Sequence, residues 1–220
     1  MALIIRDYFL LFIFYSIFGW ASEVIYAFIM KRKITNRGFM IGPYCPIYGV
    51  GSLLIIILLS QYKVHPIGLC VLAMVICSVL EYVTGYVLEK LFKARWWDYS
   101  NTRFNINGRV CLDTLIPFGI LACLIMYVIN PAVLHILNKV PNKALNIISV
   151  IIAIIFVFDF VASFNIVNNF KQTIKKVSLE DKTDDINNYI KSLFTEKSFL
   201  YRRLIQAFPK IKAITKRKKD

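Results

Sequence analysis

Five long apolar runs most strongly constrain what this chain can fold into. They cover residues 8–30, 47–60, 66–92, 112–137 and 144–170, and four of them are longer than 20 residues. A helix of about 20 residues crosses the ~30 Å hydrocarbon core of a bilayer. Only helices and closed barrels satisfy their own backbone in lipid, and runs this long exclude the barrel. We therefore expect an all-α helical membrane protein with five spans.

Composition and helix-breaking residues refine this expectation. The mean hydropathy is +0.60, and a soluble chain of 220 residues needs more polar surface than a composition of 18% charged residues provides. The first run is too long for a cleaved signal peptide and has no small-residue cleavage site. Glycines and prolines at 42–51 predict a turn and a broken start to the second run. Pro131 predicts a kink or an early stop in the fourth.

The basic residues predict the orientation. Four Lys and Arg lie in the connection 31–45, five in 90–112 and fourteen in 171–220, whereas the other connections hold Lys63, Lys139 and Lys143. Short basic connections stay on the cytoplasmic side. We therefore expect a multi-pass membrane protein with its amino terminus outside and its carboxyl terminus in the cytoplasm.

The last fifty residues form the second of two predicted regions, a basic cytoplasmic helical tail (171–220) after a transmembrane domain (1–170). More than half of the +14 net charge lies in this tail, so we expect contact with anionic lipids and not with nucleic acid. Apolar residues at helical spacing predict a first amphipathic helix with Ile186, Tyr189, Ile190, Leu193 and Phe194, and a second over 199–214. These helices would lie on the inner leaflet or bind a partner.

Three carboxylates lie deep within the predicted spans: Glu23, Glu81 and Asp159. A charge at the centre of a bilayer costs about 2.5–3.5 kcal/mol on insertion scales, so each must face protein or water. Glu23, Glu81 and Asp159 lie 8 to 12 residues before the basic ends of their spans, which predicts a similar depth. Two interpretations fit: one polar cavity open to the cytoplasm, or buried ion pairs that hold the helices together. Glu81, Gly85 and Glu89 share one helix face, with a glycine for close approach between two acids.

A polar and aromatic island, residues 94–113, separates the third and fourth runs. Its candidate binding side chains are Arg95, Trp97, Asp98, Tyr99, Arg103, Asn107, Arg109 and Asp113. The three arginines are the obvious counter-charges for the acidic face, and guanidinium groups bind phosphate or carboxylate in a bidentate way. The pair Asn107–Gly108 predicts a tight turn that presents Arg109. An anionic headgroup or substrate is the ligand that this chemistry favours.

Two island residues have further expectations. Asp98 lies between Arg95 and Arg103, which predicts an ionised and oriented carboxylate. Trp96 and Trp97 directly follow a span, so we expect at least one of them in the aromatic belt at the headgroup level.

Several kinds of chemistry have no support in the sequence. The five cysteines, at 45, 70, 77, 111 and 123, form no C-x-x-C pair, so no metal site and no cofactor are expected. Both histidines, His65 and His135, fall on the predicted outer side. No phosphate-binding G-x-x-x-x-G-K-[ST] motif is present, so the chain is not expected to hydrolyse ATP by itself.

Four segments together resemble a known family. They are FGWASEVIY (18–26), RGFMIGPYCPIYGVG (37–51), LEYVTGYVLEKLF (80–92) and RWWDYSNTRFNINGRVCL (95–112). They resemble bacterial membrane proteins catalogued as ABC-transporter permeases of the CmpB-like type, over residues ~15–130. The resemblance implies a polytopic inner-membrane protein that works in transport with an ATP-binding subunit in trans.

Three functions remain open from the sequence. The chain is a permease component, alone or as a homo-oligomer, that handles an anionic or amphipathic substrate through a cytoplasm-facing Arg, Asp and Glu site. Alternatively, it is an intramembrane enzyme that acts on a phospholipid or lipid-linked headgroup, with Asp98, Glu81 or Asp113 as general base. In the third hypothesis it is a non-catalytic scaffold or sensor.

Overall fold

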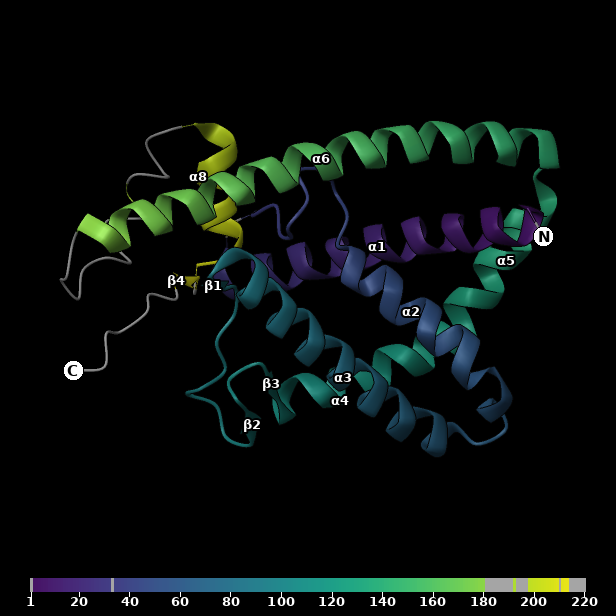
Figure 1. Cartoon of the computed structure of the whole chain (residues 1–220). Coiled ribbons are helices and arrows are strands. Elements are labelled where there is room, and N and C mark those ends of the chain that lie inside the picture. The colour runs from purple at the N-terminus through teal and green to yellow at the C-terminus, as the bar shows by residue number, and fades with distance from the viewer. Residues whose placement is uncertain (1, 33, 181–191, 193–197, 210, 214–220) are drawn as a thin grey trace.

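Helices make up most of the chain. The computed structural model describes residues 2–32, 34–180, 192, 198–209 and 211–213. The helices are α1 (Ala2–Lys31), α2 (Pro46–Leu59), α3 (Pro66–Phe92), α4 (Leu112–Leu124), α5 (Asn130–Lys139), α6 (Asn142–Glu180) and α8 (Phe199–Ala207), as Figure 1 shows. Two short irregular helices, η1 (Ser60–Tyr62) and η2 (Ile125–Ile129), extend α2 and join α4 to α5. Short antiparallel pairs join β1 (Ala94–Arg95) to β4 (Lys212–Ala213) and β2 (Asn105–Ile106) to β3 (Val110–Cys111).

The multi-pass helical membrane fold is confirmed. Among the described residues, four helices are long and apolar enough to cross a bilayer: Ile4–Met30, Pro66–Phe92, Leu112–Lys139 and Asn142–Ile174. The remaining predicted span is a shorter apolar helix, Pro46–Tyr62. Its 14 α-helical residues rise by only about 21 Å, less than the ~30 Å hydrocarbon core. The fifth crossing therefore stays a prediction.

The helices run back and forth along one axis. In Figure 1, α1 runs from right to left, and α2, α3, α4–α5 and α6 then alternate in direction. The connection 32–45, the island and α8 consequently lie at one end of the molecule, which we call the basic end. The amino terminus and the two short connections lie at the other. This clustering is the arrangement that the positive-inside pattern requires, whereas the side of the membrane stays a prediction.

The fourth span changes direction at its proline. Pro131 has no N–H to donate to the carbonyl four residues earlier, and the five residues directly before Asn130 form the wider π-helical segment η2. The helix then continues to Lys139 at a different angle (Figure 1). The predicted kink is therefore present, and the helix does not stop early.

Apolar clusters join the helices in layers. Ile55 and Leu59 of α2 pack with Leu69 and Ala73 of α3 and with Ala122 of α4. A second cluster joins α1 to the other end of the fourth span, and its buried members are Leu11, Tyr15, Ile125 and Val133. In contrast, α6 exposes most of its apolar side chains, such as Phe158 at 77% and Ile154 at 66%. Such a surface is stable in contact with lipid.

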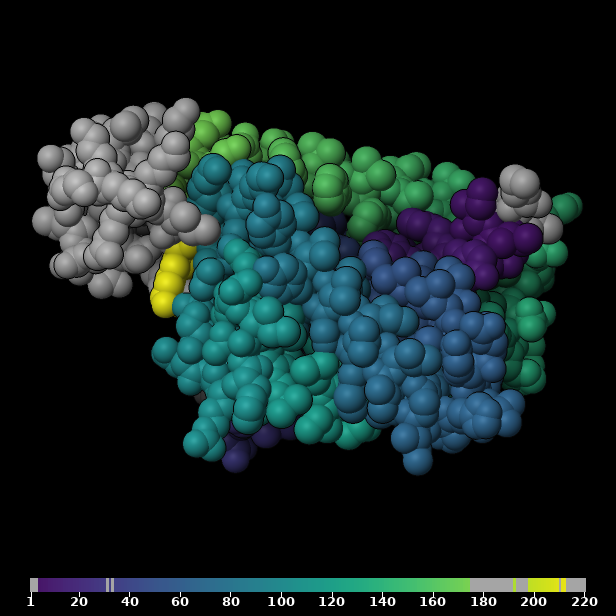
Figure 2. Space-filling model, turned by 60° about the horizontal axis from the view of Figure 1, so that its bottom comes forward, coloured from purple at the N-terminus to yellow at the C-terminus, as the bar shows by residue number. Residues whose placement is uncertain are grey.

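The tail departs from the sequence prediction. Helix α6 continues without a break past residue 170 to Glu180. The apolar face of α8 buries Leu204 and Ala207 and belongs to a cluster with Trp96 and Phe170. Figure 2 shows the yellow C-terminal segment against the teal residues at the same end of the molecule. We expected this face to contact lipid or a partner, and it is instead covered by the chain's own core. The helix predicted around residues 186–194 lies outside the described residues.

Trp96 is not the tryptophan of the expected aromatic belt, so that expectation stays a prediction for Trp97. Its side chain is only 2% exposed, and its ring meets that of Phe208 edge to face with 4.8 Å between centroids. The packing of α8 therefore removes Trp96 from the lipid headgroup belt.

Candidate functional site

One carboxylate bridges two arginines at the basic end. Helix α3 ends at Phe92, and Lys93 takes a left-handed conformation (φ 55°) that turns the chain back along the helix. Arg95 then returns beside Glu89, and its Nε donates to Glu89 Oε1 over 2.8 Å. The other oxygen of Glu89 accepts from Arg109 Nη2 over 2.5 Å. We call Glu89, Arg95 and Arg109 the bridged-arginine site.

A tight hairpin presents Arg109 to this site. Strands β2 and β3 pair around Asn107 and Gly108, which both have positive φ angles of 52° and 68°. Asn and Gly adopt this left-handed conformation more readily than other residues, and the backbone N–H of Arg109 donates to the carbonyl of Ile106 over 3.0 Å. The hydrogen bond to Glu89 is the main reason that the pKa of Arg109 is raised. The predicted turn is therefore present, and it carries a permanently charged guanidinium.

Aromatic side chains surround the same guanidinium. Its central carbon lies 5.2 Å from the ring centroid of Tyr82 and 5.5 Å from that of Tyr86, within the range of cation–π attraction. The indole of Trp97 donates to the carbonyl of Arg109 over 2.9 Å. A Cβ on Gly85 would approach the Trp97 ring to 3.2 Å, so the glycine on the acidic face lets the indole lie against α3.

Asp98 is the second anchor of the site. It accepts from Lys212 Nζ at 2.7 Å, from Ser100 Oγ at 2.6 Å and from Arg95 Nη1 at 3.4 Å. These contacts, with Lys212 foremost, hold the pKa of Asp98 well below its usual range. Lys212 belongs to β4, which pairs with β1 of the island. The ionised carboxylate that the sequence predicts is present, but its main partner is a tail lysine and not Arg103.

A second cluster contains the deeper carboxylates of α1 and α3. Glu81 accepts from the hydroxyl of Tyr99 at 3.2 Å and from that of Thr114 at 3.3 Å. Glu23 accepts from the hydroxyl of Tyr48 at 2.6 Å. Burial is the main cause of the raised pKa of Tyr99, followed by Glu81, and Glu23 also contributes. Neither acid has a basic group within 4.0 Å among the described residues.

Asp159 has a different environment. Its two oxygens accept from the backbone N–H groups of Ile41 (3.0 Å) and Gly42 (2.6 Å), from the Tyr44 hydroxyl (2.6 Å) and from Ser163 Oγ (2.8 Å). A Cβ on Gly42 would lie 2.6 Å from Asp159 Oδ2. The carboxylate thus holds the connection between α1 and α2 against α6.

The structure divides the predicted residues into groups. Glu89, Arg95, Asp98 and Arg109 form one ion-paired network, and Trp97 and Asn107 support it; Asn107 donates to the Tyr82 hydroxyl over 3.0 Å. Glu23, Glu81 and Tyr99 form the hydroxyl-bonded group, and Asp159 stands apart from both. Arg103 and Asp113 are exposed, and neither has a hydrogen bond or ion pair within the described part of the chain.

Sequence reasoning missed the neutral and distant partners. Tyr44 and Tyr48 lie in the Gly- and Pro-rich segment that only indicated a broken helix, and Tyr82 lies one turn before Tyr86 on the acidic helix. Lys212 carried no signal, because it is one basic residue among many in the tail. The spacing of Tyr82 and Glu89 on one face of α3 was the signal that could have found the aromatic partner of Arg109.

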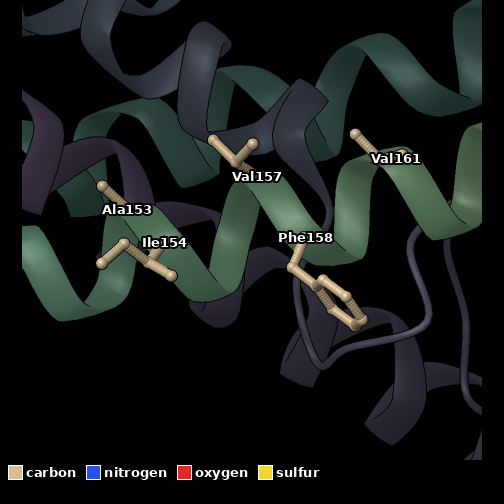
Figure 3. Close-up of a pocket in the computed structure, with 5 residues that line it drawn as sticks. All are labelled: Ala153, Ile154, Val157, Phe158 and Val161. Atoms are coloured by element: carbon tan, nitrogen blue, oxygen red, sulfur yellow. The ribbon is translucent and has the colours of Figure 1, made fainter.

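Two further features bear on a binding site: an apolar hollow on α6, and the described side chains that could bind a metal. A hollow of about 530 Å³ lies along α6, lined by Ala153, Ile154, Val157, Phe158 and Val161 (Figure 3). It has only one helix as its wall, so it resembles a lipid-facing surface more than a substrate site. Within the described residues, no group of three His, Cys, Asp or Glu side chains could hold a metal ion.

Comparison with known protein families agrees with the helical fold and with the segments that carry the motifs. No curated protein and no solved structure matches the chain. A family model described as "putative ABC-transporter type IV", of the CmpB kind, matches residues 10–164. That region includes the bridged-arginine site, the carboxylates Glu23, Glu81 and Asp159, and most of the four helices that are long and apolar enough to cross a membrane. The chain therefore belongs to the CmpB family of type IV ABC-transporter-like membrane proteins.

Proposed function

We propose that this protein is the membrane component of a transporter and that it handles an anionic or amphipathic substrate at the bridged-arginine site. One observation carries the proposal. A single carboxylate, Glu89, occupies the space between two guanidinium groups, and each of its oxygens serves a different arginine. An anionic group of a substrate fits the same geometry, because guanidinium groups bind phosphate and carboxylate alike.

If the anionic group of a substrate took the place of the Glu89 carboxylate, both arginines would keep a negatively charged partner. Arg109 also has a spare donor, since its Nε is buried without a hydrogen-bond partner. The rings of Tyr82 and Tyr86 would cover the apolar part of an amphipathic substrate beside that anion. The exposed apolar side chains of α3, such as Val79 and Val83, would guide it along the lipid boundary.

We propose that the basic end and the carboxyl terminus lie in the cytoplasm of a bacterial cell and that the protein lies in its inner membrane. The positive-inside pattern supports this orientation. ABC-transporter families work in general with an ATP-binding partner, and this chain has no phosphate-binding loop. We therefore propose an ATP-binding subunit in trans. We also propose that a second copy can complete the path, and that anionic lipids surround the basic end.

The enzyme alternative loses one of its three candidate bases. A general base needs a pKa near the working pH, whereas the contacts of Asp98 with Lys212 and Ser100 lower its pKa far below this. Asp113 is exposed, and Glu81, bonded to the hydroxyls of Tyr99 and Thr114, stays a candidate base. The bridged arginines and the matched family favour the transporter over the enzyme.

The first test is the composition of the native complex. The protein is purified in mild detergent from its own membrane, and the intact mass of the complex is measured. An ATP-binding subunit at fixed stoichiometry supports the proposal. A protein that emerges alone, or with only its own copies, would remove the ATP-driven mechanism.

A matched pair of variants then tests the site. Arg109→Gln removes a guanidinium that contacts Glu89, and Arg103→Gln removes an exposed guanidinium without a described contact. We expect Arg109→Gln to lower substrate-stimulated ATPase activity of the reconstituted complex by at least tenfold, as for loss of one charge-assisted contact. Arg103→Gln should stay within about twofold of the parent protein, since exposed charges contribute little. Equal effects of the two variants would refute the site.

A further inference from the structure

Among the described residues, two arginines outside the bridged-arginine site have buried guanidinium nitrogens and no acidic partner. Arg203 lies on the packed face of α8, between the apolar side chains of the tail cluster, and only 8% of it is exposed. Within the described part of the chain its Nε and Nη1 have no hydrogen-bond partner, and its Nη2 donates to the carbonyl of Phe39 over 3.3 Å. Arg37, in the connection between α1 and α2, is half-buried, and its Nε is buried without a described partner.

The two side chains reach across the same interface in opposite directions. Arg203 of α8 extends to a carbonyl of the connection at Phe39, and Arg37 of the connection extends to the carbonyl of Ala207 on α8 over 3.4 Å. Both guanidinium groups act on the buried thiol of Cys45, and both lower its pKa against the larger effect of burial. Three guanidinium nitrogens without acceptors therefore lie at the interface between the connection and α8. They are Arg37 Nε, Arg203 Nε and Arg203 Nη1.

Asp159, the carboxylate that acts on Arg203, does not neutralise the guanidinium groups at this interface. Asp159 acts on Arg203 at a distance, yet the two make no ion pair within 4.0 Å. The oxygens of Asp159 are already used by Ile41, Gly42, Tyr44 and Ser163. Burial is the main reason that the pKa of Arg203 is lowered.

A buried cation without a partner is strongly unfavourable, and an anion that supplies acceptor oxygens reverses this. Phosphate has enough oxygens for several guanidinium N–H groups and matches their planar geometry. Neither arginine contacts the bridged-arginine site, whose charges are balanced by Glu89 and Asp98.

We propose that Arg37 and Arg203 form a second anion site that binds one phosphate group, and that this phosphate fixes α8 to the connection between α1 and α2. The group comes from an anionic lipid headgroup or from free phosphate. The site does not depend on the proposed transport function.

Thermal unfolding of the purified full-length protein tests this site. In detergent, sodium phosphate is titrated against sodium chloride at equal ionic strength; in nanodiscs, phosphatidylglycerol is compared with phosphatidylcholine. At a ligand concentration of 100 times Kd, the Tm of the parent protein should rise by about 5 °C or more. A rise with sodium phosphate identifies free phosphate, and a rise only with phosphatidylglycerol identifies a lipid headgroup.

Arg203→Met is the informative variant, because it removes the buried charge and keeps an apolar side chain of similar length. Without phosphate its Tm should equal or exceed that of the parent protein, since an unpaired buried guanidinium is lost. It should also lose the rise that the ligand causes. Arg37→Met should weaken binding about tenfold or more, and Arg103→Met serves as the exposed control with an unchanged response.

Two results would overturn the proposal. The first is a parent protein whose Tm responds to neither probe. The second is an Arg203→Met protein that responds as strongly as the parent and the exposed control, since the phosphate would then bind elsewhere.

Discussion

Replacement of Asp159 by Asn should release the connection between α1 and α2. The carboxylate accepts four hydrogen bonds, and Oδ2 alone accepts from the Gly42 N–H and the Tyr44 hydroxyl, both at 2.6 Å. The asparagine amide keeps one acceptor oxygen and places donor hydrogens at the other position, where the Gly42 N–H already points. A hydrogen bond to a charged group contributes about 1.5–3 kcal/mol.

The expected loss is about 3 kcal/mol, below the sum for two such bonds because the Tyr44 hydroxyl can turn and accept. Since about 1.4 kcal/mol corresponds to a factor of ten, opening of the connection should become about 100-fold more frequent. Cys45 reports this opening, because its thiol is 6% exposed at the end of the same connection. Burial raises its pKa to about 12, and the reactive thiolate is therefore scarce while the connection is closed.

The assay is the rate of maleimide labelling at pH 7.5 in a background that retains Cys45 alone. Asp159→Asn should be labelled about 100-fold faster than its parent. Ser163→Ala, which removes one of the four donors, should be labelled no more than about tenfold faster. A rate for Asp159→Asn within about threefold of the parent would refute the claim that this carboxylate holds the connection.

Three further predictions concern the basic end. Glu89→Gln leaves two guanidinium groups without their shared carboxylate and should lower stability by about 2–4 kcal/mol, seen as a lower Tm. Gly85→Ala places a methyl group 3.2 Å from the Trp97 ring; displacement of the indole should red-shift its fluorescence. The Asp98–Lys212 ion pair should persist from pH 7 to about pH 4, because folding lowers the pKa of Asp98. The stabilisation is complete above the pKa of Asp98 in the unfolded chain. It is lost as the pH falls through the lower pKa of the folded protein. The distance between spin labels on β1 and β4 at each pH measures this. The exposed lysine limits the contribution to less than about 1 kcal/mol.

Each of these has a control or an opposing outcome. Asp113→Asn removes an exposed carboxylate and should leave the Tm unchanged, so a drop equal to that of Glu89→Gln would contradict the ion-pair argument. Gly68→Ala meets its nearest atom at 3.7 Å, an ordinary contact, and should not change the fluorescence. Separation of the two strands between pH 7 and pH 5 would mean that another group holds the strand pair.

The membrane fold could be predicted because its signals are local. Run length and apolarity are read from neighbouring residues, and the bilayer then leaves the helix as the available backbone structure. The kink at Pro131 and the turn at Asn107–Gly108 were predictable for the same reason, since each follows from the chemistry of one or two residues. Run length does not decide whether the second helix crosses the membrane, because a run of 14 residues suits either a short span or a helix that stops within the membrane.

The candidate site was only partly predictable. The island and the acidic face of α3 are adjacent in sequence, and their pairing through Glu89 follows from the turn at Lys93. Besides near neighbours such as Ser100 and Ser163, Asp98 has a partner 114 residues away and Asp159 has partners more than 110 residues away. A lysine in a basic tail, or a backbone N–H in an irregular connection, has no periodicity that would mark it.

The sequence by itself determined that this chain crosses a membrane repeatedly as helices, that its charges gather in three connections, and that arginines and carboxylates meet at the island. The tertiary structure alone decided that α8 packs on Trp96 and Phe170, that Asp159 holds the connection at residues 41–44, and that guanidinium nitrogens of Arg37 and Arg203 are buried without an acid among the described residues. The physical reason is range: lipid selects helices from local apolarity, whereas hydrogen bonds and ion pairs depend on which distant segments the packing brings together.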